Sequence, residues 1–107
     1  MRATPFELEH ERHPDAIVVR ARGKFDGGAA EAIEALLPAG RAERVVLNLG
    51  QIDYISSSGV AALVKLSSTR PLRIASPAQC VRDVLSLAGI ERILSIHGDE
   101  EAARAGG

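Results

Sequence analysis

The longest apolar stretch of the chain runs from position 45 to position 66 and changes its pattern halfway. Val45–Leu49 is almost continuously apolar, which is typical of a strand buried on both faces in the middle of a parallel sheet. Gly50 is expected to end this strand. Gly59–Leu66 is apolar on almost every side, and Lys65 is its only charge, which predicts a well-buried helix. A strand, a polar turn and a buried helix are therefore expected here.

Strand patterns recur on both sides of this stretch. Phe6–Glu11 alternates with a period of two, as a half-exposed strand does. Ala16–Arg22 predicts a second strand, close enough to pair antiparallel with the first across a turn at His13–Asp15. Leu72–Ala75 and Ile93–Ile96 predict two further short strands.

A glycine-punctuated loop, Gly23–Gly28, is expected before the first helix. Asp26 is placed to cap that helix, which is predicted over Ala29–Leu37 and stops before Pro38 and Gly40.

The third helix is expected to begin at Ser76-Pro77, with serine as the cap and proline in the first turn, and to end at Gly89. Its apolar face consists of residues at helical spacing: Val81, Val84, Leu85 and Ala88. Asp99–Arg104 can form a terminal helix.

These elements alternate in the order ββαβαβαβα, which predicts an α/β fold. We expect a mixed, mostly parallel central sheet of about five strands with helices packed on it, and the first strand antiparallel at or near an edge. The length of 107 residues predicts a single domain over residues 1–107, with a core of about 6–104.

Composition argues against several classes of function. A net charge of −1 gives no electrostatic attraction to nucleic acid or to an anionic membrane, and 3% aromatic residues leave few stacking platforms for single strands. The sequence shows no signal peptide and no apolar stretch long enough for a membrane span. The lone Cys80 offers no disulfide. We expect a cytoplasmic domain, monomeric when free, and the preference for arginine and alanine hints at a GC-rich bacterial genome.

No catalytic set assembles from the titratable residues. The histidines lie at expected strand ends and turns and are interpreted as solvated side chains: His10, His13 and His97. Cys80 falls early in the third helix, where a small buried side chain is more common than a nucleophile. Asp26 and Asp53 could approach the turn at Ser56–Ser58 if their loops meet at one sheet edge, but each is more often a cap or turn residue. We expect no enzyme activity, no metal and no cofactor.

The turn at Ser56–Ser58 has three interpretations. Ser57 or Ser58 can simply be the N-cap of the following helix, and from the turn alone this is the favoured interpretation. The turn could instead bind an anion at the positive end of the helix dipole, or one of its serines could be phosphorylated. The glycine spacing of a P-loop, the GxGxxG pattern and the GxSxG pattern are all absent from the sequence.

Four segments in order resemble the STAS domain family, most closely the bacterial anti-sigma factor antagonists. They are Val18–Asp26, Val45–Leu49, Ile52–Gly59 and Val84–Ile90. The resemblance runs from about the first strand to the last helix. Each segment is weak alone, whereas the four at family spacing are specific.

The resemblance implies a partner-switching function without enzyme activity. In such antagonists a serine kinase anti-sigma factor of the GHKL type binds the antagonist and phosphorylates a serine at the start of the second helix, and a PP2C-type phosphatase reverses the modification. The unmodified antagonist captures the anti-sigma factor and frees the sigma factor. The phosphorylated serine of the family corresponds to Ser57, with Ser58 and Ser56 as alternatives. Its kinase-contacting aspartate corresponds to Asp26, and Gly59 completes the partner-binding turn.

One position departs from the commonest family motif. That motif has Asp directly before the two serines, where this chain has Ser56, although related domains also carry Ser there. Two other functions stay open. One is a STAS subunit of a lipid-transport ABC system or a stressosome-like scaffold, with constitutive contacts. The other is a small-ligand or nucleotide sensor that binds an anion at the serine turn.

Overall fold

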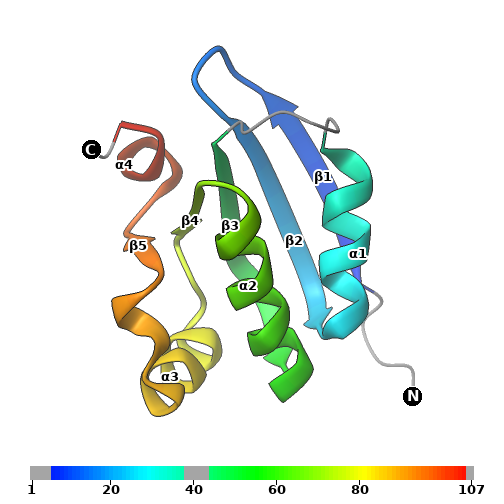
Figure 1. The fold of residues 1–107 in the computed structure, drawn as a ribbon, viewed down its shortest axis with the longest axis vertical. Coiled ribbons are helices and arrows are strands. Elements are labelled where there is room, and N and C mark those ends of the chain that lie inside the picture. The colour runs from blue at the N-terminus through cyan, green and yellow to red at the C-terminus, as the bar shows by residue number, and fades with distance from the viewer. Residues whose placement is uncertain (1–5, 38–43, 106–107) are drawn as a thin grey trace.

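The computed structural model describes residues 6–37 and 44–105. Over these residues the strands form one five-stranded sheet in the order β1-β2-β3-β4-β5 (Figure 1). The strands are β1 (Glu7–Arg12), β2 (Ile17–Phe25), β3 (Val45–Ile55), β4 (Leu72–Ala75) and β5 (Ser95–His97). β1 pairs antiparallel with β2 at one edge, and the other neighbours are parallel. The predicted mixed, mostly parallel sheet is confirmed.

The helices are divided between the two faces of the sheet. They are α1 (Gly27–Leu36), α2 (Ser57–Thr69), α3 (Gln79–Ala88) and α4 (Glu100–Ala105), with a short 3₁₀ turn, η1 (Ile90–Arg92). Helices α1, α2 and α3 cover one face and share the larger core cluster with it (Figure 1). α4 packs on the opposite face, where Ala103 meets Val18, Val46 and Ala75. The predicted order ββαβαβαβα and the α/β class are confirmed.

The partial cover by α4 explains the change of pattern along the central strands. Ile17–Val19 and Val45–Leu47 are buried on both faces, because helices lie on either side of them. Beyond Arg20 and Asn48 one face of the sheet is open, and buried and exposed residues alternate along β2. The two central strands are therefore buried on both faces at one end and on only one face at the other.

β2 and β3 are both longer than the sequence predicted. Gly23–Phe25 belongs to β2 and not to a loop, and β3 continues through Gly50 to Ile55. The two strands pair along their whole length, with register shifts between Arg20 and Arg22 and between Gly23 and Lys24. These irregularities let β3 carry extra residues, which hid the strand pattern in the sequence.

The predicted start of one helix and the predicted bounds of one strand were also wrong. Helix α3 begins at Gln79 after an Ala78 cap without a side-chain bond, and not at Ser76-Pro77. Ser76 instead has a φ of 48° and donates its hydroxyl to the Gly98 carbonyl oxygen. The last strand is Ser95–His97, not Ile93–Ile96, because η1 precedes it and the Leu94 side chain turns into the core.

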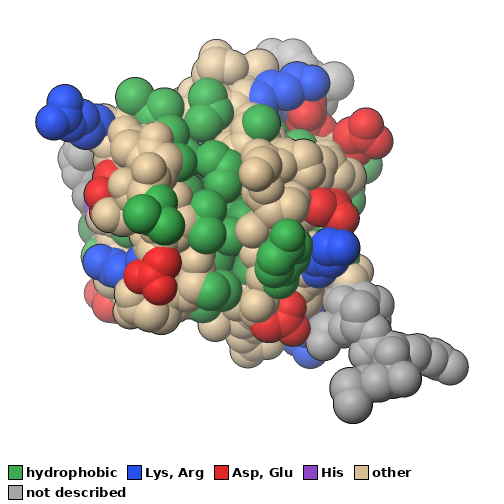
Figure 2. Space-filling view, turned by 90° about the horizontal axis from the view of Figure 1, so that it is seen from below, with side chains coloured by type: hydrophobic (Ala, Val, Ile, Leu, Met, Phe, Trp, Pro, Cys, Tyr) green, Lys and Arg blue, Asp and Glu red, His purple; other side chains and the backbone are tan. Residues whose placement is uncertain are grey.

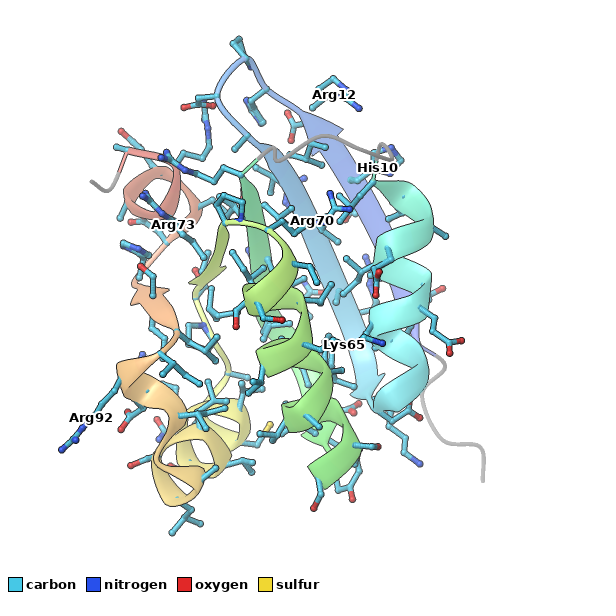
Figure 3. All side chains as sticks on the ribbon, in the orientation of Figure 1. His10, Arg12, Lys65, Arg70, Arg73 and Arg92 are labelled. Atoms are coloured by element: carbon cyan, nitrogen blue, oxygen red, sulfur yellow. The ribbon has the colours of Figure 1, made fainter. Side chains whose placement is uncertain are left out.

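Helix α2 is less buried than its composition predicted. Its buried side chains lie on one face: Ala62, Leu63 and Leu66. Lys65 projects from the outward side near α1 (Figure 3). Gly89 ends α3 in the left-handed conformation as expected. Pro38 and Gly40, the expected stop of α1, lie outside the described residues.

No helix in the described ranges is long and apolar enough to cross a membrane.

Candidate functional site

The N-termini of α1 and α2 lie side by side at one end of the molecule. β2 and β3 are parallel neighbours, so the helices that follow them begin at the same sheet edge. A backbone hydrogen bond links the ends of β2 and β3 here, because the Ser56 N–H donates to the Phe25 carbonyl oxygen at 3.1 Å. Figure 2 views the molecule from this end and shows a band of hydrophobic side chains with charged side chains towards its margins.

Asp26 is the N-cap of α1, as predicted. Its backbone is extended, and its Oδ1 accepts a hydrogen bond from the Gly28 N–H at 3.0 Å. The Asp26 carbonyl oxygen also accepts from the Ala29 N–H at 3.0 Å. The carboxylate therefore stands at the positive end of α1, half-buried and next to the serine turn.

Ser56 is the N-cap of α2, and the prediction that Ser57 or Ser58 is the cap was wrong. Ser56 has an extended backbone, with φ −91° and ψ 170°, and its Oγ accepts from the Gly59 N–H at 3.1 Å. Because β3 continues to Ile55, the residue after it is the last one with a non-helical backbone, which is the conformation that an N-cap requires.

Ser58 joins the two helix starts. The Gly27 N–H at the start of α1 donates to Ser58 Oγ at 3.1 Å, and Ser58 Oγ lies 2.9 Å from Ser56 Oγ. One of these two hydroxyls must donate to the other, so both are engaged. The hydrogen bonds connect the Asp26 loop, the Ser56 cap and helix α2 into one surface.

Ser57 differs from its two neighbours. Its side chain is exposed, and no hydrogen bond within the described part of the chain engages its hydroxyl. It is the first residue of α2, where backbone N–H groups are free of intrahelical partners. Its hydroxyl is thus open to solvent at the positive end of a helix.

Gly59 lets the helix start approach the sheet closely. It is buried, and a Cβ built on it would overlap the Phe25 carbonyl oxygen and lie 3.0 Å from Ile55 Cγ1. Glycine is required here for close backbone contact and not for an unusual φ angle.

Asp53 is not part of this set. It is exposed on β3, at the residue skipped between the pairs Gly23–Ile52 and Lys24–Tyr54, and it makes no hydrogen bond with the serine turn. The Lys24 ammonium instead lies 5.6 Å from the centre of the exposed Tyr54 ring, near the same end of the sheet.

The remaining candidates lie apart from one another. His10 is exposed on β1, His13 Nε2 lies 3.5 Å from Glu11 Oε2, and His97 Nε2 lies 2.8 Å from Ser95 Oγ. Cys80 is half-buried, with Sγ 3.5 Å from the Ile52 carbonyl oxygen. Among the residues with described positions, no cluster of His, Cys, Asp and Glu could hold a metal ion.

A group of short ion pairs lies on the opposite face of the sheet, beside α4. Arg20 binds Glu100 through Nε at 2.7 Å and Nη2 at 2.8 Å, and its Nη2 also binds Glu11 Oε1 at 2.9 Å. Asn48 donates to the same Glu100 carboxylate at 2.7 Å. The Arg20 hydrogen bond holds the pKa values of Glu100 and Glu11 below their ordinary values, and the carboxylates raise the pKa of Arg20.

Two arginine side chains on the same face donate hydrogen bonds to backbone carbonyl oxygens of α4. Arg44 Nη1 donates to the Arg104 carbonyl oxygen at 2.8 Å, and Arg73 Nη1 donates to the Ala103 carbonyl oxygen at 2.9 Å. Figure 3 shows Arg73 beside α4. These contacts position the last helix and do not take part in the serine turn.

Sequence reasoning missed a set of apolar residues beside Ser57. Val60 of α2 and Val84, Leu87 and Ala88 of α3 line a groove together with Ser57. Leu87 is 89% exposed. The signal was present in the sequence, because Leu87 does not belong to the predicted apolar face of its helix.

Comparisons with known proteins place this geometry in a family. A model of the STAS domain matches residues 7–103. A comparison with curated proteins finds no significant match.

Several solved structures share the fold. One is an anti-sigma factor antagonist from Mycobacterium paratuberculosis, with a TM-score of 0.80 at 17% identity, over 92% of this chain and 91% of that chain. The anti-sigma factor antagonist SpoIIAA in its unphosphorylated form has a TM-score of 0.64 at 22% identity, over 92% of both chains. The Bacillus cell fate determinant SpoIIAA in the phosphorylated form has a TM-score of 0.61 at 22% identity, over 92% of this chain and 96% of that chain. With the family model covering nearly all of the described sheet and helices, the chain belongs to the STAS domain family.

Proposed function

We propose that the protein is a bacterial anti-sigma factor antagonist that works in the cytoplasm by partner switching. Its unmodified form binds a GHKL-type serine kinase anti-sigma factor and thereby frees a sigma factor. The kinase phosphorylates Ser57 and ends the binding, and a PP2C-type phosphatase restores it. The protein itself catalyses nothing in this scheme.

The observation that carries the proposal is the state of the Ser57 hydroxyl. It is exposed and unbonded within the described part of the chain, whereas the hydroxyls of Ser56 and Ser58 are engaged in hydrogen bonds. A kinase can therefore reach Ser57 without breaking the cap of α2. In the transfer, Ser57 Oγ forms a bond to the γ-phosphorus of ATP, the bond to the β-phosphate oxygen breaks, ADP leaves and the hydroxyl proton passes to a base on the kinase.

The position of Ser57 at a helix start also supports a phosphorylation that changes partner binding and leaves the fold intact. A phosphoserine carries about −1.5 to −2 charges, and at a helix N-terminus it meets a favourable dipole and free N–H donors. The protein SpoIIAA, whose fold this chain shares, has been described in phosphorylated and unphosphorylated forms.

The replacement of the common aspartate by Ser56 is compatible with this function. Ser56 performs the capping role that an aspartate would perform at the same place, since both residue types are good N-caps. What the replacement removes is one negative charge beside Ser57. We therefore expect the substitution to influence which kinase recognises the turn more than whether the turn forms.

The test is incubation with ATP and each GHKL-type serine kinase encoded in the same genome, followed by intact-mass measurement. We expect one added phosphate on the wild type and on Ser86→Ala, a control at another exposed serine, and none on Ser57→Ala. If a kinase labels Ser57→Ala as fully as the wild type, the assignment to Ser57 is wrong.

Two further measurements, of kinase binding and of the unfolding temperature with nucleotide alone, separate the other two functions. Stable binding to a partner without any gain of phosphate would favour a scaffold with constitutive contacts. A rise in the unfolding temperature with nucleotide alone would favour a small-ligand sensor.

A further inference from the structure

The outer side of β1 is an unpaired edge of the sheet. β1 is the first strand in the order β1-β2-β3-β4-β5, and no strand of the described ranges pairs with its other side (Figure 1). Edge strands are the places where an extended segment of another chain can add to a sheet. This edge lies two strands away from β3, whose end carries the serine turn.

The hairpin between β1 and β2 determines which backbone groups of β1 are available. The His13 N–H donates to the Ala16 carbonyl oxygen at 2.8 Å, and the Ala16 N–H donates back to His13 at 3.4 Å. Hydrogen-bonded pairs alternate along an antiparallel ladder, so every second residue of β1 directs its N–H and C=O groups towards β2: Glu7, Glu9 and Glu11. The N–H and C=O groups of Leu8 and His10 therefore point outward from the edge.

The side chains of the inward-bonded residues form a row of carboxylates on the open face of the sheet. This acidic row consists of Glu7, Glu9 and Glu11, and each of the three side chains is 50% to 60% exposed. Successive residues of a strand point to opposite faces, so Leu8 and His10 lie on the other face, where Leu8 packs against the core.

Two arginines of β2 contact the acidic row from its inner side. Arg22 Nε lies 3.7 Å from the first glutamate of the row, and its Nη2 lies 3.8 Å from the second. Arg20 binds the last glutamate at 2.9 Å but also binds Glu100, and His13 Nε2 lies 3.5 Å from the same last glutamate. Two arginines thus serve four carboxylates, which leaves the face beside the edge with a surplus of negative charge.

A second copy of this chain does not fit the edge. Two copies would pair their β1 strands antiparallel about a twofold axis perpendicular to the sheet, with the same faces of both sheets on one side. Residues directly opposite each other share a face, so every register that overlaps the two acidic rows sets glutamate against glutamate. Like charges in that position are destabilising.

We propose that the edge of β1 binds an extended segment of a partner protein in which every second residue is lysine or arginine. The segment pairs with the outward backbone groups of Leu8 and His10 and places its cations opposite the acidic row, on the side away from the arginines of β2. Charge complementarity selects such a segment over an acidic or uncharged one and over a second copy. The inference goes beyond the proposed function, because this edge does not include the serine turn.

The first test uses three eight-residue peptides, each acetylated and amidated, and NMR of the isotope-labelled protein. One peptide alternates lysine and threonine, one has four lysines followed by four threonines, and one alternates glutamate and threonine. We expect the alternating lysine peptide to bind about tenfold more tightly than the block peptide, because three opposite-charge pairs form only when the cations alternate. The glutamate peptide should not bind.

Hydrogen exchange separates strand pairing from general attraction between charges. Strand addition should slow exchange at the N–H groups of Leu8 and His10, which point outward. The N–H of Glu9 already donates to β2 and should change little.

Two variants test the backbone and the charge separately. His10→Pro removes one outward donor, which an edge strand tolerates, and should weaken binding of the alternating lysine peptide by at least about tenfold. Glu9→Gln removes the central charge of the row and should weaken it about twofold to fivefold. Glu31→Gln, at an exposed glutamate of α1, is the matched control and should retain the affinity of the wild type. Thermal unfolding verifies that all three variants are folded.

The proposal is overturned if the alternating lysine peptide does not bind, or if it binds no more tightly than the block peptide. Unchanged exchange at Leu8 and His10 with the peptide bound would also overturn it, because the attraction would then be that of any cation for an acidic surface. Kinase labelling at Ser57 is measured separately, so failure of the edge proposal leaves the proposed function standing, and the reverse also holds.

Discussion

The three consecutive serines are chemically alike, and their positions at the end of β3 give them different roles. Ser56 accepts from the Gly59 N–H, Ser58 accepts from the Gly27 N–H, and Ser57 faces solvent. Ser56 caps α2, Ser58 joins the starts of two helices, and Ser57 exposes its hydroxyl to solvent. A sequence motif cannot separate these roles, because any of the three residue positions could have been the cap.

We predict that substitutions at Ser56 and Ser57 differ in their effect on stability. Ser56→Ala removes the cap of α2 and should lower the free energy of unfolding by about 1 kcal/mol. Ser57→Ala removes no hydrogen bond and should change it by less than about 0.5 kcal/mol. Urea unfolding of the two variants and the wild type measures both values. A loss at Ser57 as large as the loss at Ser56 would show that the cap is misassigned.

Gly59 should tolerate no side chain. Gly59→Ala places a Cβ against the Phe25 carbonyl oxygen and should destabilise the protein by about 1–3 kcal/mol, since the helix start must move away from the sheet. Gly98→Ala is the matched control, because a Cβ there meets nothing within 4 Å. Chemical unfolding compares the two, and equal stability of both variants would contradict the close contact.

At the scale of single elements, α4 is the part whose attachment depends most on charge. It buries Ala103 against the sheet, and Glu100 binds both Arg20 and Asn48. Arg44 and Arg73 donate hydrogen bonds to its backbone carbonyl oxygens. Because the helix is short, these contacts supply what its small apolar face cannot.

The pKa of Glu100 gives this attachment a pH dependence. The hydrogen bond from Arg20 holds that pKa below its ordinary value, so the folded state favours the charged carboxylate. The resulting stability is fully present above the pKa of Glu100 in the unfolded chain, about 4.3, and is lost as the pH falls through the lower folded value.

We therefore expect Glu100→Gln to lower stability at neutral pH and to flatten its decline under acid conditions. Glu101→Gln, at an exposed neighbour on the same helix, is the control and should leave the pH profile unchanged. Free energies of unfolding between pH 3 and pH 7 provide the measurement. Parallel profiles for Glu100→Gln and the wild type would contradict this role of the ion pair.

The sequence predicted most elements because their patterns were local. Leu72–Ala75 was placed at its observed bounds, and the Asp26 cap and the Gly89 end were correct. The ends of β2 and β3 were missed because the open sheet face and the register shifts break both the continuous and the alternating pattern there. The start of α3 was predicted wrongly at Ser76 for a similar reason. The Ser76 hydroxyl donates to the carbonyl oxygen of Gly98, a residue distant in sequence.

The candidate site was only partly accessible to sequence reasoning. The proximity of Asp26 to the serine turn followed from parallel strands ending at one edge, and the structure brings the two together. The bond between Gly27 and Ser58, and the groove at Leu87, depend on how α1, α2 and α3 pack, which no single segment encodes.

For the whole molecule, the candidate site is a surface at one end of the sheet, and the buried core does not reach it. The buried side chains of β2, β3 and α2 lie behind the serine turn, and the exposed hydroxyl of Ser57 lies in front of them. A negative group added at Ser57 should therefore alter what docks at this end and leave the core packing unchanged.

The most direct measurement of this account compares kinase affinity before and after complete phosphorylation of the same protein sample, with thermal unfolding of both forms. The account predicts that phosphorylation weakens binding by about two to four decades while the unfolding temperature changes by only a few degrees. Equal affinity of the two forms, or loss of binding that accompanies unfolding of the phosphorylated chain, would contradict it.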